Sequence, residues 1–539
     1  MKTKIIWLAV SCLIVASLLL VSCAPEAVGR EEEVVSPEEE AVPEEEEEVS
    51  LTPAPSKARG TINLVNTGKS RKLPVRLLGF QAVPLYEHLT DTPAKVAIAK
   101  EMVPAFVRFP GGMVGNYYSW RSGQLELNVK TNSSATYRFF ARVAEQIKQL
   151  HPQGVFIESY YQFSQAIGAE IVLLVNLETS SIGDQVEWVK KMKSEGILPR
   201  YLELGNEFWL AMLGDPNVLK KWPDTATTMR VMKEYRDALQ PFFAAGTKVA
   251  VQAAANRFYV AYTGGKLVQP TALKNWDDSL KPEPWFDAVT IHLYPDIDRI
   301  AGVGLKETLP ENMDTIWPAV MARCDQGVDE AISTVERQLP GKEIWITEWS
   351  GYQWGGTNTS EPVFHPLGLH SHMTTRMLMA FLRHSSVTMA HYHMLNFSGG
   401  PMSLYRYDTQ SGSYVPISSA IILKWFNQAA NGGATYQRLK VDGARWINSS
   451  VTAEEGYYDI EAVQFQKGNT TTIIVHNAGH EVKRLPVSGL VSSRLPTKIE
   501  STVAVPTDDY SSSAPPVQEI VPAEEIEVPA YSVTRMVWE

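Results

Sequence analysis

The chain is poor in cysteine and in positive charge, and both shortages exclude functions. Only Cys12, Cys23 and Cys324 occur in 539 residues, and the first two fall in the N-terminal segment. The single Cys of the body therefore has no intramolecular disulfide partner. Its place in a probable helix favours a structural thiol over a catalytic one. The net charge of −11 provides no basic face, so we expect no nucleic-acid partner.

Long apolar runs are scarce too, and the one that is present lies at the N-terminus. Lys2 and Lys4 precede an apolar stretch over 5–20, which is typical of an export signal covering residues 1–22. Leu-Val-Ser-Cys at 20–23 resembles a bacterial lipobox, in which Cys23 is lipidated and becomes the new N-terminus. An ordinary cleaved signal and an uncleaved anchor are the alternatives. We therefore expect an exported protein. Its lipid is expected to anchor it to the bacterial cell surface or to the periplasmic face of a membrane.

An acidic, low-complexity segment follows over 23–59. It holds twelve Glu against three cations, which is most of the net charge. Such a segment cannot bury a core, and we expect a disordered, self-repelling linker. The remainder is nearly neutral, and the chain as a whole is 44% hydrophobic, enough for a large core and two domains.

Apolar, β-prone runs alternate with helical stretches through most of the chain, which predicts the α/β class and a (β/α)8 TIM barrel over 78–430. A texture of short alternating runs over 431–539 predicts a C-terminal antiparallel β-sandwich. One or two strands in 60–77 are expected to join that sandwich. The eight barrel strands are expected at 77–82, 105–109, 170–176, 200–205, 247–253, 286–292, 343–347 and 387–396.

Two of these strands end in a carboxylate beside aromatic residues. YLELGNEFWL at 201–210 presents Glu207, and EIWITEWSG at 343–351 presents Glu348. Barrel enzymes carry their catalytic groups at the C-terminal ends of the strands. Two carboxylates placed there are typical of a glycoside hydrolase, one as acid/base and one as nucleophile. A helix N-cap for the first and a surface-loop position for the second are the structural alternatives.

The motifs around these carboxylates resemble those of clan A glycoside hydrolases, and most closely the family 51 α-L-arabinofuranosidases. The resemblance implies Glu207 as acid/base, Glu348 as nucleophile and a retaining mechanism. Two motifs differ from the family: LLGFQAVPLYEHL replaces Gly-x-Phe-x-Glu-His at strand one, and Thr-Glu-Trp-Ser surrounds Glu348. β-Glucuronidases of the heparanase type, family 39-type relatives, xylosidases, endoglucanases and a non-catalytic carbohydrate-binding lipoprotein stay open as alternatives. The matching stretches are VRFPGGMVGNYYSW at 107–120, VNLETSSIGDQVEWVKKM at 175–192, ELGNE at 203–207 and IHLYP at 291–295.

Polar and aromatic residues near the same strand ends are expected to bind an oligo- or polysaccharide substrate. The histidine-rich stretches at 365–372 and 391–393 lack a zinc-binding motif and are interpreted as residues of the site mouth. The proposed chemistry requires no metal and no organic cofactor. The expected substrate-binding residues are Arg108, Asn206, His292, Tyr294, Trp120, Trp349 and Asn396.

Overall fold

The computed structural model describes most of the chain from residue 60 onward. Residues 1–59 lie outside the described residues, and with them the predicted signal, Cys23 and the acidic linker. Tyr352, Trp354 and His365 also lie outside them. The described ranges are 60–89, 92–127, 135–209, 221–255, 261–263, 266–268, 271–295, 312–351, 367–397, 402–452, 454–491, 494–508 and 516–539.

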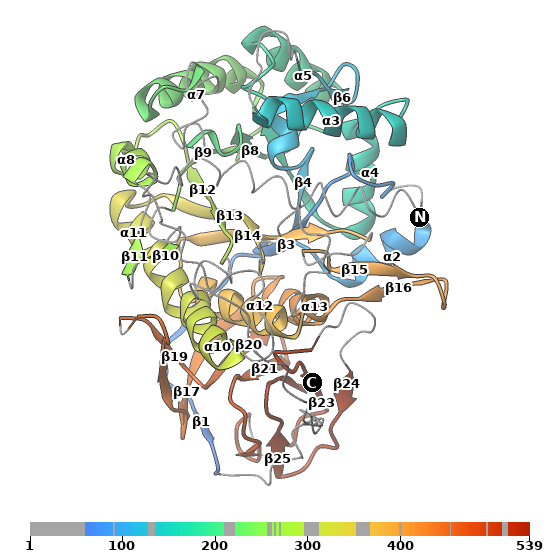
Figure 1. Cartoon of the computed structure of the whole chain (residues 1–539). Coiled ribbons are helices and arrows are strands. Elements are labelled where there is room, and N and C mark those ends of the chain that lie inside the picture. The colour runs from blue at the N-terminus through green and yellow to red at the C-terminus, as the bar shows by residue number, and fades with distance from the viewer. Residues whose placement is uncertain are drawn as a thin grey trace, which may run out of the picture.

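A parallel eight-stranded sheet forms the barrel at the upper part of Figure 1, and its strands follow the order β3-β14-β13-β12-β9-β8-β7-β4. The seam between β3 and β4 is bridged where the Ala105 amide donates to the Leu78 carbonyl over 2.7 Å. The backbones approach closely there, because a Cβ at Gly79 would overlap the Phe106 carbonyl. All eight predicted strands are confirmed. They are β3 (Leu78–Ala82), β4 (Phe106–Phe109), β7 (Glu170–Val175), β8 (Tyr201–Leu204), β9 (Lys248–Gln252), β12 (Ala288–Leu293), β13 (Glu343–Trp349) and β14 (Val387–Leu395).

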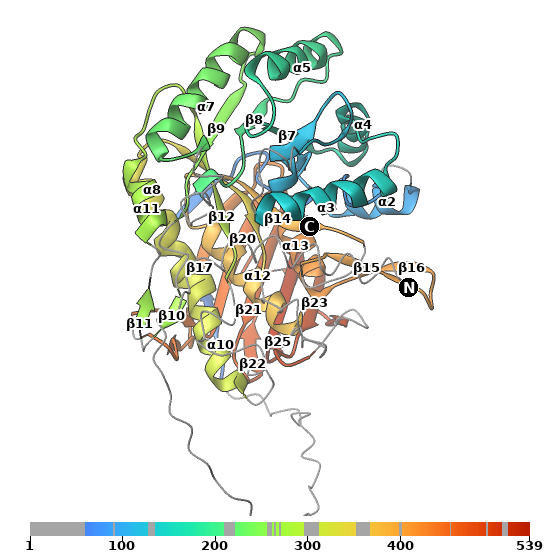
Figure 2. The same cartoon turned by 45° about the horizontal axis from the view of Figure 1, so that its top comes forward.

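Helices surround the barrel (Figures 1 and 2). The last barrel helix, of 13 residues, ends at Ala430, the last residue of the predicted barrel. Local sequence signals begin others: the Ser181 hydroxyl accepts the Asp184 amide at the start of α5, and Asp224 does the same for Thr227 at α7. The helices are α2 (Pro93–Glu101), α3 (Ala135–Leu150), α4 (Ile157–Ile167), α5 (Ile182–Ser194), α7 (Thr225–Leu239), α8 (Thr271–Ser279), α10 (Met313–Ala322), α11 (Val328–Gln338), α12 (Leu367–Phe381) and α13 (Ser418–Ala430), with shorter turns η1 (Met113–Tyr117), η3 (Gln240–Phe242) and the π-helical η6 (Arg323–Gly327).

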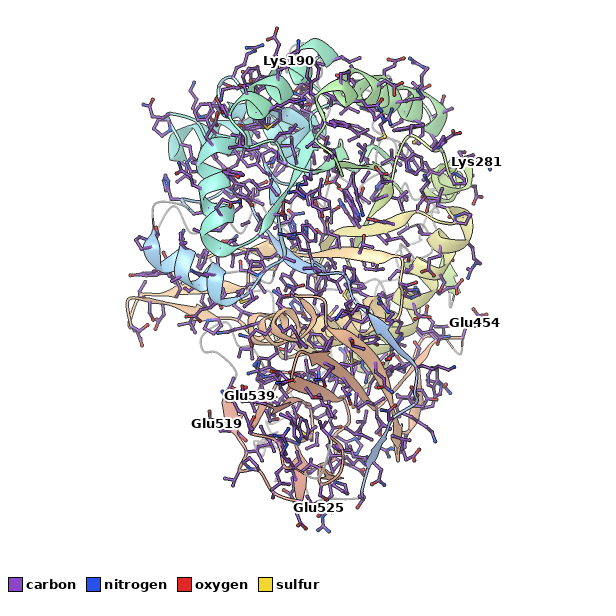
Figure 3. All side chains as sticks on the ribbon, turned by 180° about the vertical axis from the view of Figure 1, so that it is seen from behind. Lys190, Lys281, Glu454, Glu519, Glu525 and Glu539 are labelled. Atoms are coloured by element: carbon purple, nitrogen blue, oxygen red, sulfur yellow. The ribbon has the colours of Figure 1, made fainter. Side chains whose placement is uncertain are left out.

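An antiparallel sheet with the order β1-β17-β20-β21-β26-β23-β24 forms the second layered unit, as predicted. The segment before the barrel belongs to it, because β1 and β2 both pair with β17. Side chains of this sheet and of the β22–β25 ribbon share one apolar core. In Figure 3, Glu519 and Glu525 mark this end of the molecule and Lys190 marks the barrel end. The strands are β1 (Asn63–Val65), β2 (Ser70–Lys72), β17 (Thr435–Asp442), β20 (Ile460–Lys467), β21 (Thr470–Asn477), β22 (Lys483–Pro486), β23 (Lys498–Val503), β24 (Val517–Glu519), β25 (Glu525–Val528) and β26 (Ser532–Trp538).

Five short strand pairs complete the described structure, one of them the β22–β25 ribbon. The other four are hairpins, three in or beside the barrel and one next to the sandwich. Their strands are β5 (Tyr118–Ser119) with β6 (Gln124–Leu125), β10 (Ala261–Thr263) with β11 (Lys266–Val268), β15 (Tyr405–Asp408) with β16 (Ser413–Pro416), and β18 (Trp446–Asn448) with β19 (Gly456–Tyr458).

Buried charges join the barrel to the sandwich. Arg376 of α12 is fully buried and contacts Asp325 at 3.0 Å and Glu461 of β20 at 2.9 Å. Arg383 contacts the same two carboxylates. The anions hold their charge here: burial opposes ionisation of Glu461, but the neighbouring arginines lower its pKa to about 2. The junction is thus an ion network that includes residues of both units.

His372 also lies at this junction, which corrects the prediction that it lines the site mouth. Its ring stacks on His476 at a centroid distance of 5.0 Å, and its Nε2 lies 2.7 Å from the Ala504 carbonyl. Burial lowers the pKa of His372 to about 4, so the ring stays neutral at ordinary pH. Cys324 is buried and free, as expected of a structural thiol. Within the part of the chain that the structure describes, no helix combines the length and apolar character needed to cross a bilayer.

Candidate active site

Glu207 and Glu348 meet at the C-terminal ends of the barrel strands. Glu207 lies three residues beyond the end of β8, and Glu348 is the second-to-last residue of β13. One oxygen of each and a ring nitrogen of His292 all lie within 4.8 Å of one another. Both carboxylates are more than nine-tenths buried. The structure thus brings together two acids that are far apart in the sequence.

A β-bulge orients Glu348 toward the barrel interior. Ile291 of β12 pairs with Ile346 of β13, but His292 pairs with Glu348, so Thr347 is an extra residue. Bulges redirect side chains and are frequent next to active sites. The Thr347 hydroxyl donates to Glu203 at 3.0 Å and lies 3.1 Å from His292 Nε2. Thr347 and Glu348 therefore both contact inward-facing groups.

Arg108 of β4 is the central cation of the site and is completely buried. Its Nε donates to Glu203 at 2.7 Å, its Nη1 to Glu348 Oε1 at 2.6 Å, and its Nη2 to Asn206 Oδ1 at 2.7 Å. The planar guanidinium has the fork geometry that such convergent contacts require. One side chain thus fixes the carboxylate at the end of β13 and the amide that precedes Glu207.

His292 and Tyr294 complete the polar contacts of the two acids. His292 Nδ1 lies 2.5 Å from Glu207 Oε1, and the Tyr294 hydroxyl donates to Glu348 Oε2 at 2.6 Å. Arg108, Asn206, His292 and Tyr294 therefore lie where the sequence predicted them, around the pair.

The two carboxylates have opposite electrostatic environments. Burial raises the pKa of Glu207, and this effect outweighs the opposing charge and hydrogen bond of His292. Burial also disfavours the ionised form of Glu348, but there His292, His393, Arg108 and the Tyr294 hydrogen bond prevail and hold its pKa well below the ordinary range. When the pKa values of two neighbouring acids are shifted in opposite directions, one can donate a proton while the other stays ionised.

Gly112 allows the loop after β4 to lie against the site. A Cβ at this position would overlap Glu348 Oε1, and Arg108 Nη1 is the next neighbour at 3.4 Å. Gly112 therefore permits a close approach of the backbone to Glu348.

Sequence reasoning missed the residues that hold Glu207 in place. Glu207 has φ +51°, in the left-handed region that non-glycine residues avoid. Gln252 of β9 bridges the turn on both sides of it: its Nε2 donates to the Leu204 carbonyl at 2.9 Å, and its Oε1 accepts the Phe208 amide at 2.6 Å. Asn116 exchanges two hydrogen bonds with the Asn206 backbone, at 2.8 and 2.9 Å. The sequence signal that could have identified Gln252 was a side-chain amide pointing inward from a barrel strand.

We expect Gln252→Leu to lower kcat by about ten-fold while the protein stays folded, because two buried backbone groups lose their partner and the Glu207 turn loosens. Gln185→Leu is the matched control: Gln185 of α5 is equally buried, but its amide donates to Ser180, just before that helix. Steady-state kinetics and thermal unfolding of both variants check this. An equal loss of kcat in the two would contradict a positioning role for Gln252.

The structure corrects the prediction for Trp349 and places Trp120 away from the acids. Trp349 was expected to stack on sugar, but it is fully buried and packs on Phe381 and Tyr392, each at 5.1 Å between centroids. It follows Glu348 directly, and successive side chains of a strand point to opposite faces. Trp120 lines a cavity that contains neither acid among its lining residues.

The remaining predicted residue, Asn396, lies just beyond β14 and is buried. Its backbone carbonyl accepts the Tyr405 amide at 3.1 Å. His393 on the same strand lies nearer the acids: its ring packs edge-on against Tyr294 at 5.8 Å and its Nδ1 lies 3.1 Å from Gln81 Oε1.

Within the described residues, Glu207, His292 and Glu348 are the group whose ligand atoms could converge on one metal ion. Each carboxylate already has close protein partners, and the Arg108 guanidinium contacts one of them at 2.6 Å. A positive charge at that distance disfavours a divalent cation. The arrangement instead suits proton transfer and nucleophilic attack by the carboxylates themselves.

The fold of this chain is similar to the folds of solved arabinofuranosidases. No family model matches the chain, and no curated protein is similar to it in sequence. The GH51 arabinofuranosidase from Xanthomonas axonopodis pv. citri superposes with a TM-score of 0.61 at 14% identity, covering 88% of this chain and 99% of that one. AbfB, a family 51 α-L-arabinofuranosidase from Bifidobacterium longum, gives 0.63 at 16% identity and covers 89% and 100%. The chain has the fold of these enzymes. This likeness confirms the predicted barrel with its C-terminal sandwich.

Proposed function

We propose that the protein is a retaining glycoside hydrolase that cleaves O-glycosidic bonds with Glu348 as nucleophile and Glu207 as acid/base. One observation carries the proposal: two buried carboxylates with opposed pKa shifts have oxygens within 4.8 Å of one another. Retaining glycosidases separate their two carboxyl groups by about 5–5.5 Å, whereas inverting enzymes need about 6.5–9.5 Å to admit a water.

Each residue has a defined part in the proposed reaction. Glu348 forms a bond to the anomeric carbon while the bond to the leaving oxygen breaks and Glu207 gives that oxygen its proton. Glu207 then takes a proton from a water, whose oxygen attacks the same carbon and releases Glu348. Arg108 and Tyr294 keep Glu348 ionised before attack, and His292 orients Glu207.

We further propose an exo-acting enzyme with a neutral sugar at the cleavage point, an α-L-arabinofuranoside first. The Arg108 guanidinium is consumed by three protein acceptors. His393 is kept neutral, because burial lowers its pKa to about 4. Neither group is thus available to a substrate carboxylate, which disfavours the glucuronidase alternative. The folds of the arabinofuranosidases from Xanthomonas and Bifidobacterium support the same choice.

The decisive experiment is a screen of 4-nitrophenyl arabinofuranoside, xyloside, glucoside and glucuronide, followed by proton NMR of the first sugar released. We expect the arabinofuranoside to react and the initial product to keep the anomeric configuration of the substrate. Release of the opposite anomer would overturn the double displacement, and hydrolysis of the glucuronide alone would overturn the neutral-sugar assignment.

We expect kcat/KM to depend on pH in a bell-shaped curve whose acid limb lies at lower pH than usual. Turnover requires ionised Glu348, and because its pKa lies below the usual range we expect activity to persist below about pH 4.3, the ordinary midpoint of Glu. Turnover also requires protonated Glu207, so activity should fall as pH rises through the raised pKa of that residue. Glu207→Gln should remove the alkaline limb for substrates whose leaving group needs no proton. An unchanged alkaline limb in that variant would contradict the acid/base assignment.

We also propose export and lipid anchoring through Cys23, on the lipobox-like sequence at 20–23. Cys23→Ser in a bacterial host should abolish incorporation of labelled fatty acid into the protein without changing its specific activity. Equal labelling of both forms would contradict lipidation.

A further inference from the structure

A cavity lies beside the barrel, apart from the two acids. It has a volume of about 730 Å³ and is lined by the β5–β6 hairpin, the start of α4 and one side of α5. This size falls within the range of small-ligand sites, about 300–1,000 Å³. Lys190, next to the lining residue Lys191, is labelled at the top of Figure 3 and marks the region. Its lining includes Tyr118, Trp120, Arg121, Ser159, Trp188 and Lys191.

Aromatic rings form much of the cavity wall. Trp188 and Tyr118 are buried and pack on each other at 5.8 Å, and the Tyr118 hydroxyl is fixed by the Val155 carbonyl at 2.7 Å. Trp120 is partly exposed. The Arg121 guanidinium packs on the Trp120 ring at 4.3 Å from its centre. The partly exposed Trp120 ring supplies flat, apolar surface at little cost in conformational entropy, whereas Tyr118 and Trp188 are packed below the surface.

The charges at the cavity are paired within the protein. Arg121 contacts Asp184 at 2.8 Å and also Glu187, and Lys191 is paired with Glu158 and Glu195. The cavity therefore offers hydrogen-bonding groups without an excess of either charge. Aromatic surface beside polar groups whose charges are paired with one another suits an uncharged ligand with apolar ring faces and many hydroxyls, which is a neutral saccharide.

One loop connects this cavity to the acids. The chain after β4 first places Gly112 against Glu348, then bonds Asn206 through Asn116, and then provides Tyr118 and Trp120 to the cavity. Phe156 and Ile157 belong to the start of α4, and helices of a (β/α) barrel begin on the face where strands end. The cavity thus adjoins the loop that also contacts Glu348 and Asn206.

We propose that this cavity is an auxiliary binding site for a neutral polysaccharide strand, which holds a polymeric substrate while its side residues are cleaved at the acids. The inference rests on the proposed function and deepens it by naming a polymer, and not a free disaccharide, as the substrate that the enzyme retains. Small substrates do not reach the cavity, so their turnover is independent of it.

Binding is tested with soluble arabinoxylan as the probe, on full-length protein inactivated by Glu348→Ala, by calorimetry or affinity electrophoresis. In that background, Trp120→Ala should raise the Kd for arabinoxylan about ten-fold, which corresponds to the loss of about 1.4 kcal/mol. Ser159→Phe, which fills the cavity from the first turn of α4, should do the same. Trp446→Ala is the matched control, because Trp446 is 48% exposed on the β18–β19 hairpin and takes no part in the cavity.

Kinetics of the active enzyme separate the two proposals. Trp120→Ala and Ser159→Phe should raise KM for arabinoxylan about ten-fold and leave turnover of 4-nitrophenyl arabinofuranoside unchanged. Equal polymer binding by the wild-type sequence and both variants would overturn the auxiliary site while the glycosidase proposal stands. If the unmodified protein hydrolyses none of the aryl glycosides and no polymer, the proposed function itself fails. Thermal unfolding confirms that each variant is folded.

Discussion

Glu348→Ala should lower turnover by about 10⁴-fold or more without unfolding the protein, since it removes the nucleophile and leaves the barrel backbone intact. Glu343→Gln is the matched control on the same strand: Glu343 begins β13 and is partly exposed, where it pairs with Lys248 and accepts from Thr388. We expect that variant to keep near-normal activity. Kinetics with the best aryl glycoside of the screen measure both.

A small anion gives this prediction a second readout. Azide can occupy the space that the Glu348 side chain vacates and attack the anomeric carbon from the same side. We expect azide to restore turnover of Glu348→Ala with an activated aryl glycoside and to give a glycosyl azide of inverted configuration. Normal hydrolysis by the alanine variant, or rescue that yields the configuration of the substrate, would contradict the role of Glu348.

Arg108→Met should reduce the free energy of unfolding by about 3–5 kcal/mol, as expected when one partner of a buried ion pair is removed and the other charge is stranded. Arg108 has no exposed surface, and it contacts Glu203 and Glu348 directly. The loss of its positive charge should also raise the pKa of Glu348. The acid limb of kcat/KM should therefore move to higher pH in whatever protein remains folded.

Denaturant unfolding and a pH profile test this variant together. Arg230→Met provides the control, because Arg230 is largely exposed and pairs with Glu234 on the surface of α7. Exposed pairs of this kind contribute little to stability. If Arg108→Met were as stable as Arg230→Met and showed an unmoved acid limb, the central role of Arg108 would be wrong.

The barrel and both acids were predictable because they follow from short-range rules. Each core strand contains a short, mainly apolar run, and Glu207 and Glu348 stand where two such runs end. The failure at Trp349 has an equally local cause. Its neighbour Glu348 points into the barrel, so Trp349 points outward and packs on Phe381 of α12 and on Tyr392 of the adjacent strand β14.

The supporting residues could not be predicted from spacing alone. Gln252 and Gln81 look like ordinary polar residues of a strand, and their contacts with Phe208 and His393 depend on how the strands are registered around the barrel. The extra residue at Thr347 is likewise a property of pairing between β12 and β13. His372 was misplaced for a related reason: its partner His476 is 104 residues away, on the other structural unit.

The ion network of Arg376, Asp325 and Glu461 has a consequence for anyone who shortens this protein. A truncation after residue 430 would remove Glu461 and leave Arg376, a side chain with no exposed surface, short of a counter-charge. Removing residues 60–77 as well would not restore the missing counter-charge, since the strands in that range belong to the removed unit. The minimal recombinant fragment is consequently the whole span from residue 60 to the C-terminus, and a swap of sandwich modules between relatives would have to transplant both halves of the arginine–carboxylate cluster.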